Sequence, residues 1–187
     1  MVSSSTHSVG AGDADFWILK LDPQGEIEWQ KTYGGPRFDL AHSIQQTQDG
    51  GYVVGGWTRS YGAGEEDVWV LKLDPDGEIE WQKTYGGAGF DSAHSIRQTE
   101  DGGYVIAGET ESFGAGGTDV WVLKLDANGE ISGCQEGLIG ATHIVPYNTT
   151  AKARQCKQTD QTTNISPKKG SASVKETTVT PAGLCGN

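Results

Sequence analysis

Two pairs of side chains that could bind a ligand recur in this sequence at the same spacing. Asp39 precedes His42 by three residues, and Asp91 precedes His94 in the same way. If the units that carry these pairs are arranged in a ring, a carboxylate and an imidazole from each unit could line the mouth of its central channel. There they could bind a cation, a sugar or a peptide. The structural alternative is a hydrogen bond from Asp or His to nearby backbone. Exact repetition favours it, because catalysis needs unlike groups that converge.

Trp57 is a different kind of candidate, because its counterpart one repeat later is Glu109. An exposed aromatic ring that is not repeated could stack on a sugar. With the two Asp and His pairs, Trp57 completes the predicted ligand-binding set, and we predict no catalytic residue. Five other tryptophans recur in register and are interpreted as packing between repeats: Trp17, Trp29, Trp69, Trp81 and Trp121.

The sequence contains no convincing motif for a metal ion or a cofactor. The turn from Asp74 to Glu78 imitates the start of a calcium loop, but the downstream glutamate and the helices of an EF-hand are missing. The sister turns begin at Asp22 and Asp126 and are satisfied by a plain glycine-containing β-turn. The sequence contains no Gly-x-Ser-x-Gly, no phosphate loop and no His-Glu-x-x-His. We predict no metal and no cofactor.

The three cysteines lie in the last third of the chain, at Cys134, Cys156 and Cys185. They form no Cys-x-x-Cys pair, and only His143 lies near them in sequence, so they predict no metal site. One disulfide with one free thiol, or no disulfide, is compatible with this number.

A repeat of 52 residues must position all of these side chains. Residues 13–64 and 65–116 differ at only 15 of 52 positions, and a third copy begins at Asp119 and stops matching after Ile131. Residues 3–12 are similar to the end of a unit. Recent duplication and deliberate consensus construction both explain such similarity.

Alternation and glycine-rich punctuation predict four strands in the complete unit: Ser43–Thr47, Tyr52–Thr58, Asp67–Asp74 and Glu78–Tyr85. In the third of these strands alternate residues point to opposite sides, and both sides are mostly apolar. We therefore expect this strand to lie between two neighbouring sheets.

Composition and charge agree with an all-β fold. The chain has 28 glycines, six tryptophans and one methionine, which suits short strands joined by turns. Residues 1–133 carry 8 Lys and Arg against 22 Asp and Glu, a net charge of −14, whereas residues 134–187 carry 6 against 3, or +3. The repeat region should repel nucleic acid and anionic membrane. We expect no membrane insertion, and the N-terminus does not read as a signal peptide.

Four antiparallel strands in about 50 residues are typical of a β-propeller blade. The units resemble the repeats of bacterial and archaeal surface β-propellers of the seven-bladed SBBP type. The shared pattern is carried by Asp67, Trp69, Lys72, Leu73, Asp74, Gly77, Trp81, Gly86, Gly87, Ser95, Ile96, Thr99, Asp101, Gly102, Gly103 and Tyr104. The resemblance covers about residues 3–133 and implies an extracellular or cell-surface interaction module without a known activity.

We predict two regions: propeller blades in residues 1–133, and a Thr-rich segment in residues 134–187 that is extended or forms short strands. The first region supplies about two and a half blades, an incomplete ring. The chain could be a fragment, could close a ring with other copies, or could cover its open end with the C-terminal segment. We favour a homo-oligomer, in which half-blades join head to tail.

The leading functional hypothesis is a non-catalytic surface or secreted scaffold that binds carbohydrate or protein through loops at one ring face. An alternative is a structural role, in which chains assemble edge to edge into a ring or filament. A third is an enzyme with a site at the channel mouth. The fold alone does not decide among them.

Overall fold

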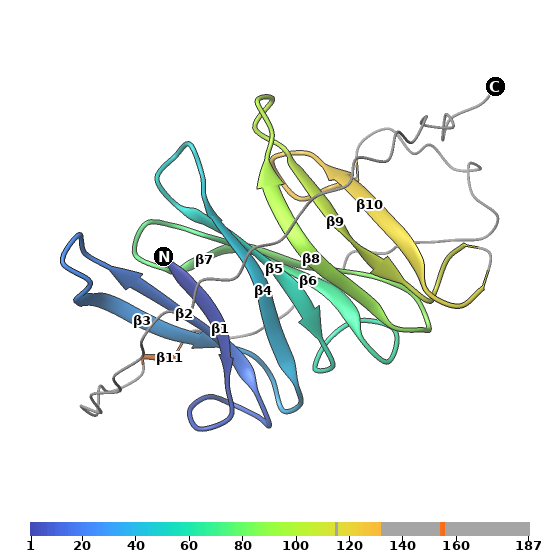
Figure 1. Ribbon diagram of the computed structural model, residues 1–187, viewed down its shortest axis with the longest axis horizontal. Coiled ribbons are helices and arrows are strands. Elements are labelled where there is room, and N and C mark those ends of the chain that lie inside the picture. Colours follow the sequence, from blue (N-terminus) through green and yellow to red (C-terminus); the bar gives the residue numbers. More distant parts are fainter. Residues whose placement is uncertain (115, 132–153, 156–187) are drawn as a thin grey trace, which may run out of the picture. The chain divides into compact units, whose positions relative to one another are not determined.

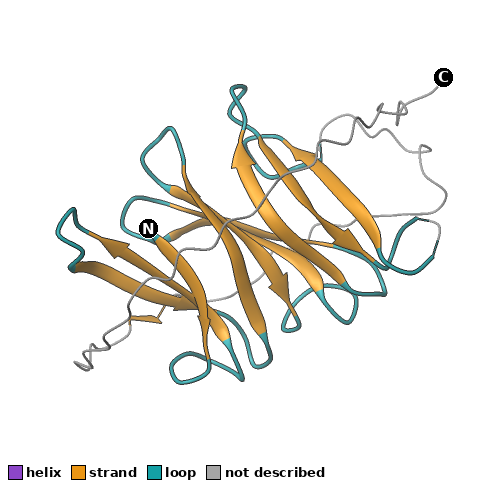
Figure 2. Cartoon of the chain, in the orientation of Figure 1, coloured by secondary structure: helices purple, strands orange, loops and turns teal. Residues whose placement is uncertain are grey.

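The computed structural model describes residues 1–114, 116–131 and 154–155. Figure 2 shows that strands and loops make up this part of the chain, with no helix. Consequently no described helix is long and apolar enough to cross a membrane. The strands are β1 (Val2–Thr6), β2 (Asp15–Leu21), β3 (Ile27–Tyr33), β4 (Asp39–Gln46), β5 (Tyr52–Thr58), β6 (Asp67–Leu73), β7 (Ile79–Tyr85), β8 (Asp91–Gln98), β9 (Tyr104–Thr110), β10 (Asp119–Leu125) and β11 (Arg154–Gln155).

The strands form three antiparallel sheets that follow the repeats. Their strand orders are β1-β2-β3-β11, β4-β5-β6-β7 and β10-β9-β8. We call them the first, middle and last sheets, and the middle sheet packs between the other two (Figure 1). The predicted fold class, all-β with four-stranded blades in a ring that is not closed, is confirmed for the described residues.

Three of the four strands predicted in the complete unit agree with the structure to within a residue at each end. The exception is β4, which begins at Asp39, four residues before the predicted Ser43. Its pairing with β5 shifts register between Ala41 and Ser43, so a β-bulge places His42 outside the regular alternation. The alternation by which the strand was recognised is therefore visible only after the bulge.

Strand β6 lies between the other two sheets, as predicted from its two apolar faces. All seven of its residues are buried. On one side Trp69 packs with Phe16 of the first sheet, at a ring distance of 4.7 Å. On the other side Val68 and Val70 pack into a core with Ile96, Tyr104, Ile106, Leu123 and Leu125 of the last sheet.

Side chains of β3 and β7 also form hydrogen bonds with a hairpin turn of the following blade. Trp29, Lys31 and Tyr33 of β3 all reach the β6–β7 turn. The Trp29 indole donates to the carbonyl of Pro75 at 3.3 Å, and the Tyr33 hydroxyl donates to that of Gly77 at 2.6 Å. The Lys31 ammonium donates to the Asp76 carbonyl and to the Glu78 carboxylate, at 2.6 and 2.7 Å. We call this set of contacts the turn clamp.

The same clamp joins the middle sheet to the last one. Tyr85 donates to the carbonyl of Gly129, Lys83 bonds to Glu130, and the Trp81 ring lies against Gly129. The tryptophans of both outer strands therefore pack between blades, as their repetition predicts. Because the clamp always runs from one unit to the next, the stack of sheets has a direction.

Part of the C-terminal region is described as well. Arg154 and Gln155 form β11, which pairs antiparallel with Thr32 and Lys31 at the outer edge of the first sheet. The other residues of the predicted Thr-rich segment lie outside the described part of the chain, and so do Cys134, Cys156 and Cys185. The predicted boundary at residue 133 stays a prediction.

Replacing Gly77 with alanine should lower the free energy of unfolding by about 2–4 kcal/mol. Gly77 has a φ of +77°, and an added Cβ would lie 2.9 Å from the Trp29 ring. Left-handed backbone costs alanine about 1 kcal/mol, and displacing the ring adds about 1–3 kcal/mol. Urea unfolding followed by tryptophan fluorescence measures the change.

Gly25→Ala is the matched control for this substitution. Gly25 has a φ of +88° in the sister turn, but no atom lies within 4 Å of an added Cβ. It should lose only the backbone term, about 1 kcal/mol. Equal losses at the two glycines would mean that displacing the Trp29 ring from the turn costs no stability.

Candidate functional site

The predicted histidines lie on neighbouring edge strands, β4 and β8. Both are exposed, and each occupies the bulge of its strand. Their rings stack with centroids 5.5 Å apart and planes inclined by 25°. The Nδ1 of His42 lies 3.0 Å from the Ala93 carbonyl oxygen, and the Nε2 of His94 lies 3.4 Å from a carboxylate oxygen of Glu109. The structure therefore brings the two histidines together on an accessible edge.

The same two strands are joined by polar side chains. Backbone N–H groups of β8 donate to side chains of β4: Ile96 donates to the Ser43 hydroxyl at 3.3 Å, and Gln98 to the Gln45 amide at 2.7 Å. In return, the side-chain oxygen of Gln98 accepts from the backbone of Gln48 at 2.8 Å. Side chains of one blade thus satisfy the free backbone edge of the next. Within this ladder, the contact between His42 and Ala93 is one further rung.

Asp39 and Asp91 were predicted to line the mouth of a channel. In the structure both residues are fully buried. The Asp39 carboxylate accepts from the Thr58 hydroxyl, from the Ser60 hydroxyl at 2.8 Å and from the Gly35 backbone at 2.7 Å. Asp91 repeats this network one unit later. Each carboxylate ties the loop before its own strand to the end of the adjacent strand. Burial raises the pKa of Asp39, although these hydrogen bonds oppose the shift.

A second buried carboxylate supports the loop that enters β6. Asp67 accepts hydrogen bonds from the backbone of Ala63 at 3.0 Å and of Gly64 at 3.1 Å. Burial raises the pKa of Asp67 to about 6, and the nearby carboxylate of Asp91 adds to the shift, whereas the two backbone hydrogen bonds oppose it. Asp15 holds the equivalent loop of the first unit.

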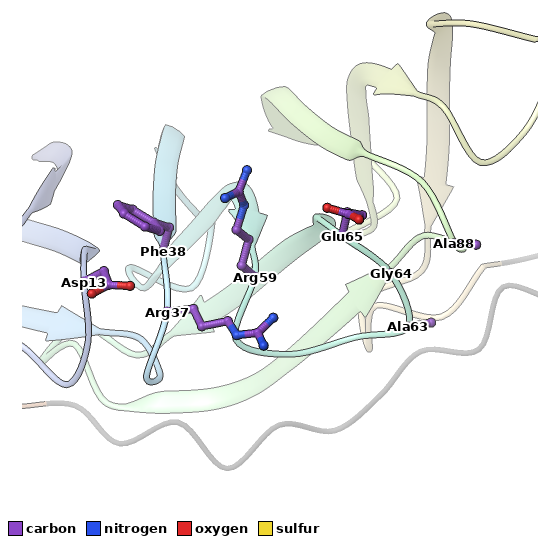
Figure 3. Close-up of a pocket in the computed structure, with 8 residues that line it drawn as sticks. All are labelled: Asp13, Arg37, Phe38, Arg59, Ala63, Gly64, Glu65 and Ala88. Carbon is purple, nitrogen blue, oxygen red and sulfur yellow. The ribbon is translucent and has the colours of Figure 1, made fainter.

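A pocket of about 550 Å³ opens among the loops that these aspartates support. Its lining comes from separate loops of successive units: Asp13, Arg37, Phe38, Arg59, Ala63, Gly64, Glu65 and Ala88. In Figure 3 the side chain of Arg37 extends toward the loop that carries Ala63 and Gly64, while Arg59 lies between Phe38 and Glu65. The volume lies within the range of small-ligand sites.

Arg59 connects the pocket with the predicted Trp57. Its guanidinium donates twice to one carboxylate oxygen of Glu66, at 3.0 and 2.7 Å. The same group lies 5.9 Å from the centre of the Phe38 ring and 5.8 Å from that of Trp57. These distances are those of cation–π contacts, so Arg59 holds two aromatic side chains around one fixed charge. Trp57 does not line the pocket itself.

Three charged side chains of the pocket are exposed and make no hydrogen bond or ion pair with other described residues. They are Asp13, Arg37 and Glu65. The backbone N–H of Arg37 donates to the Ser60 hydroxyl at 3.0 Å and anchors this residue in its loop. The pocket therefore offers one guanidinium donor and two carboxylate acceptors that are free for a ligand.

Arg37, Phe38 and Arg59 are not among the site residues predicted from the sequence. The usable signal was the set of positions at which two nearly identical units differ: Arg37 corresponds to Gly89, and Arg59 to Glu111. In the next unit Glu111 accepts a hydrogen bond from the Thr118 hydroxyl at 2.9 Å, in place of the ion pair with Glu66. Trp57, which corresponds to Glu109, shows the same difference between units.

Within the described residues, no group of three or more His, Cys, Asp or Glu side chains could hold a metal ion. Residues 47–80 match a family described as "Domain of unknown function (DUF5122) beta-propeller". No curated protein matches the chain at a significant level. The family match supports a propeller-like repeat, whereas assignment to the SBBP type stays a prediction.

Stability should fall as the pH rises from about 4 to about 6, because the folded state keeps the Asp67 proton that the unfolded state releases. The stabilisation is complete below the unfolded pKa of 3.8 and is lost as the pH passes the folded value of about 6. At about 1.4 kcal/mol per pKa unit, this group contributes roughly 2–3 kcal/mol.

Asp67→Asn should remove that part of the pH dependence, since asparagine keeps an oxygen acceptor for the loop and cannot ionise. Urea unfolding between pH 4 and pH 8 measures the slope. Asp76→Asn, at an exposed position of the β6–β7 turn, is the control and should keep the wild-type slope. An unchanged slope in Asp67→Asn would exclude Asp67 as the titrating group.

Proposed function

We propose that this chain is a non-catalytic propeller scaffold of the cell surface or extracellular space that binds a neutral carbohydrate in the pocket around Arg37 and Phe38. The observation that carries the proposal is the convergence of unlike side chains from different loops on one cavity. The repeated blades supply the support, and the loops supply the recognition.

The chemistry of the lining favours a neutral polyol over a charged ligand. Sugar hydroxyls both donate and accept hydrogen bonds, so they can donate to Asp13 and Glu65 and accept from Arg37. The half-buried ring of Phe38 offers an apolar surface for the C–H groups of a sugar. The two carboxylates and the strongly acidic repeat region disfavour an anion, and the two arginines disfavour a cation.

The arginines of the proposed site are not repeated in the next unit of the framework. One unit later, Gly89 and Glu111 replace the two arginines, so that position lacks the pocket's guanidinium groups. The scaffold residues, in contrast, keep their types, including the buried Asp39 and Asp91. A site that differs between units fits selective recognition, whereas the repeated residues fit a common structural role.

Two further considerations support a binding role at the cell surface. The resemblance to surface propellers supports the location. The contacts of His42 and His94 with each other, a backbone carbonyl and Glu109 join neighbouring blades and leave the pocket as the candidate binding site.

Arg37→Gly should weaken carbohydrate binding at least tenfold, because it removes the free guanidinium and introduces the residue that the next unit already carries. The probe is a panel of neutral and acidic oligosaccharides, screened on an array and then titrated against the chain by calorimetry. We expect a neutral sugar to bind and an acidic one of equal length to bind less tightly.

Arg97→Gln is the matched control, because Gln45 occupies that position in the preceding unit and Arg97 lies outside the pocket. It should bind the same sugar as the wild type does. A double change, Arg59→Glu with Glu66→Thr, copies the hydrogen-bonded pair of the next unit and should also lose binding. Retained affinity in both pocket variants, or no binding to any neutral sugar, would reject the proposed site.

A further inference from the structure

The last sheet exposes an apolar face that the middle sheet buries. Val120 and Val122 of β10 are 86% and 60% exposed. Their equivalents in β6, Val68 and Val70, are 1% and 0% exposed because the last sheet covers them. We call the face with Val120 and Val122 the leading face. Isolated exposed valines are ordinary, but these two are neighbours on one strand and have a buried counterpart.

The first sheet also has an exposed apolar face, on the side that faces away from the middle sheet. Trp17, Leu19 and Leu21 of β2 are partly exposed, whereas their equivalents Trp69, Leu71 and Leu73 are completely buried. Val2 of β1 is 44% exposed, and its equivalent Val54 is 0% exposed. We call the face with Val2 and these three residues the trailing face.

The two open faces are the two halves of an interface that the chain already builds. Between the middle and last sheets, Val68 and Val70 meet the side of β10 that carries Trp121, Leu123 and Leu125. Val120 and Val122 repeat the first set residue for residue, and Trp17, Leu19 and Leu21 repeat the second. We propose that the leading face of one chain docks on the trailing face of a second copy, head to tail.

The replacement of Gly55 by alanine in the last sheet is consistent with docking of a second copy of the chain. Gly55 of β5 faces the last sheet, where an added Cβ would lie 3.3 Å from Ile96 and 3.8 Å from Ala93 of β8. The last sheet has Ala107 at the equivalent place, with the methyl group that Gly55 lacks. The described part of the first sheet contains no strand equivalent to β8. The extra methyl group therefore meets no such strand in a second copy.

The intermolecular contact should be weaker than the two internal ones. No atom lies within 4 Å of a Cβ added to Gly25, so the first unit's turn is not clamped as Gly77 is by Trp29. The residues that would supply this clamp from the last unit are Gly133, Gln135 and Gly137 in sequence, in place of tryptophan, lysine and tyrosine. Association should therefore be reversible and concentration-dependent, and a head-to-tail contact can propagate or close a ring.

The test is the mass of the full chain in solution, measured by sedimentation equilibrium over a wide concentration range. We expect association of the wild type, and at least a tenfold larger dissociation constant in Val122→Glu and in Leu19→Glu. These variants block the leading and the trailing face, respectively. Phe90→Glu is the control, because Phe90 is also exposed but lies in the β7–β8 loop and belongs to neither face, and it should associate as the wild type does.

Mixing the two blocked variants identifies the geometry. Each retains one intact face, so an equimolar mixture should form a one-to-one heterodimer that grows no further. Dimer formation also establishes that both variants are folded, and Val122→Ser replaces Val122→Glu if the glutamate prevents folding. A wild-type monomer at all concentrations, undiminished association of the blocked variants, or a mixture that stays monomeric would each overturn the proposal. The first result would point to another segment of the chain on the leading face.

Discussion

The contact between an outer-strand tryptophan and a turn glycine of the next unit is the constraint on which the arrangement of sheets depends. The indole of Trp29 lies where a side chain on Gly77 would begin, so this position must lack a Cβ, and its positive φ favours glycine as well. Tyr33 and Lys31 then bond to the same turn. One hairpin turn thereby fixes both the path of its own blade and the position of the preceding one.

The strands could be predicted from the sequence, but the contacts between residues of different strands and loops could not. Alternation identified β5 and β6 and assigned their faces, because a strand between two sheets needs apolar residues on both sides. The start of β4 was missed because the bulge at His42 interrupts that alternation. The burial of Asp39 could not be predicted, because the local sequence around an aspartate does not show whether its carboxylate faces water or is surrounded by N–H and hydroxyl donors.

The pocket was missed for a different reason, which is that its residues come from loops more than 20 positions apart in sequence. Nothing in a local pattern brings Asp13 near Arg37 or Glu65. Comparison of the units separates two populations of residues. Those that hold blades together keep their identity, as Trp29 and Trp81 do, whereas Arg37, Trp57 and Arg59 change. In a repeat of this kind, divergence between copies is a better guide to recognition than repetition is.

The ladder between β4 and β8 has a consequence for how such a chain can change in length. Side chains of one unit bond to the backbone of the next in a fixed register, through Ser43 and Gln45. Deleting one residue would displace every rung, whereas deleting or copying all 52 residues of a unit keeps the register of the ladder. Unequal recombination between the near-identical copies could therefore alter the number of blades in a single step without shifting the strands of one blade against those of the next.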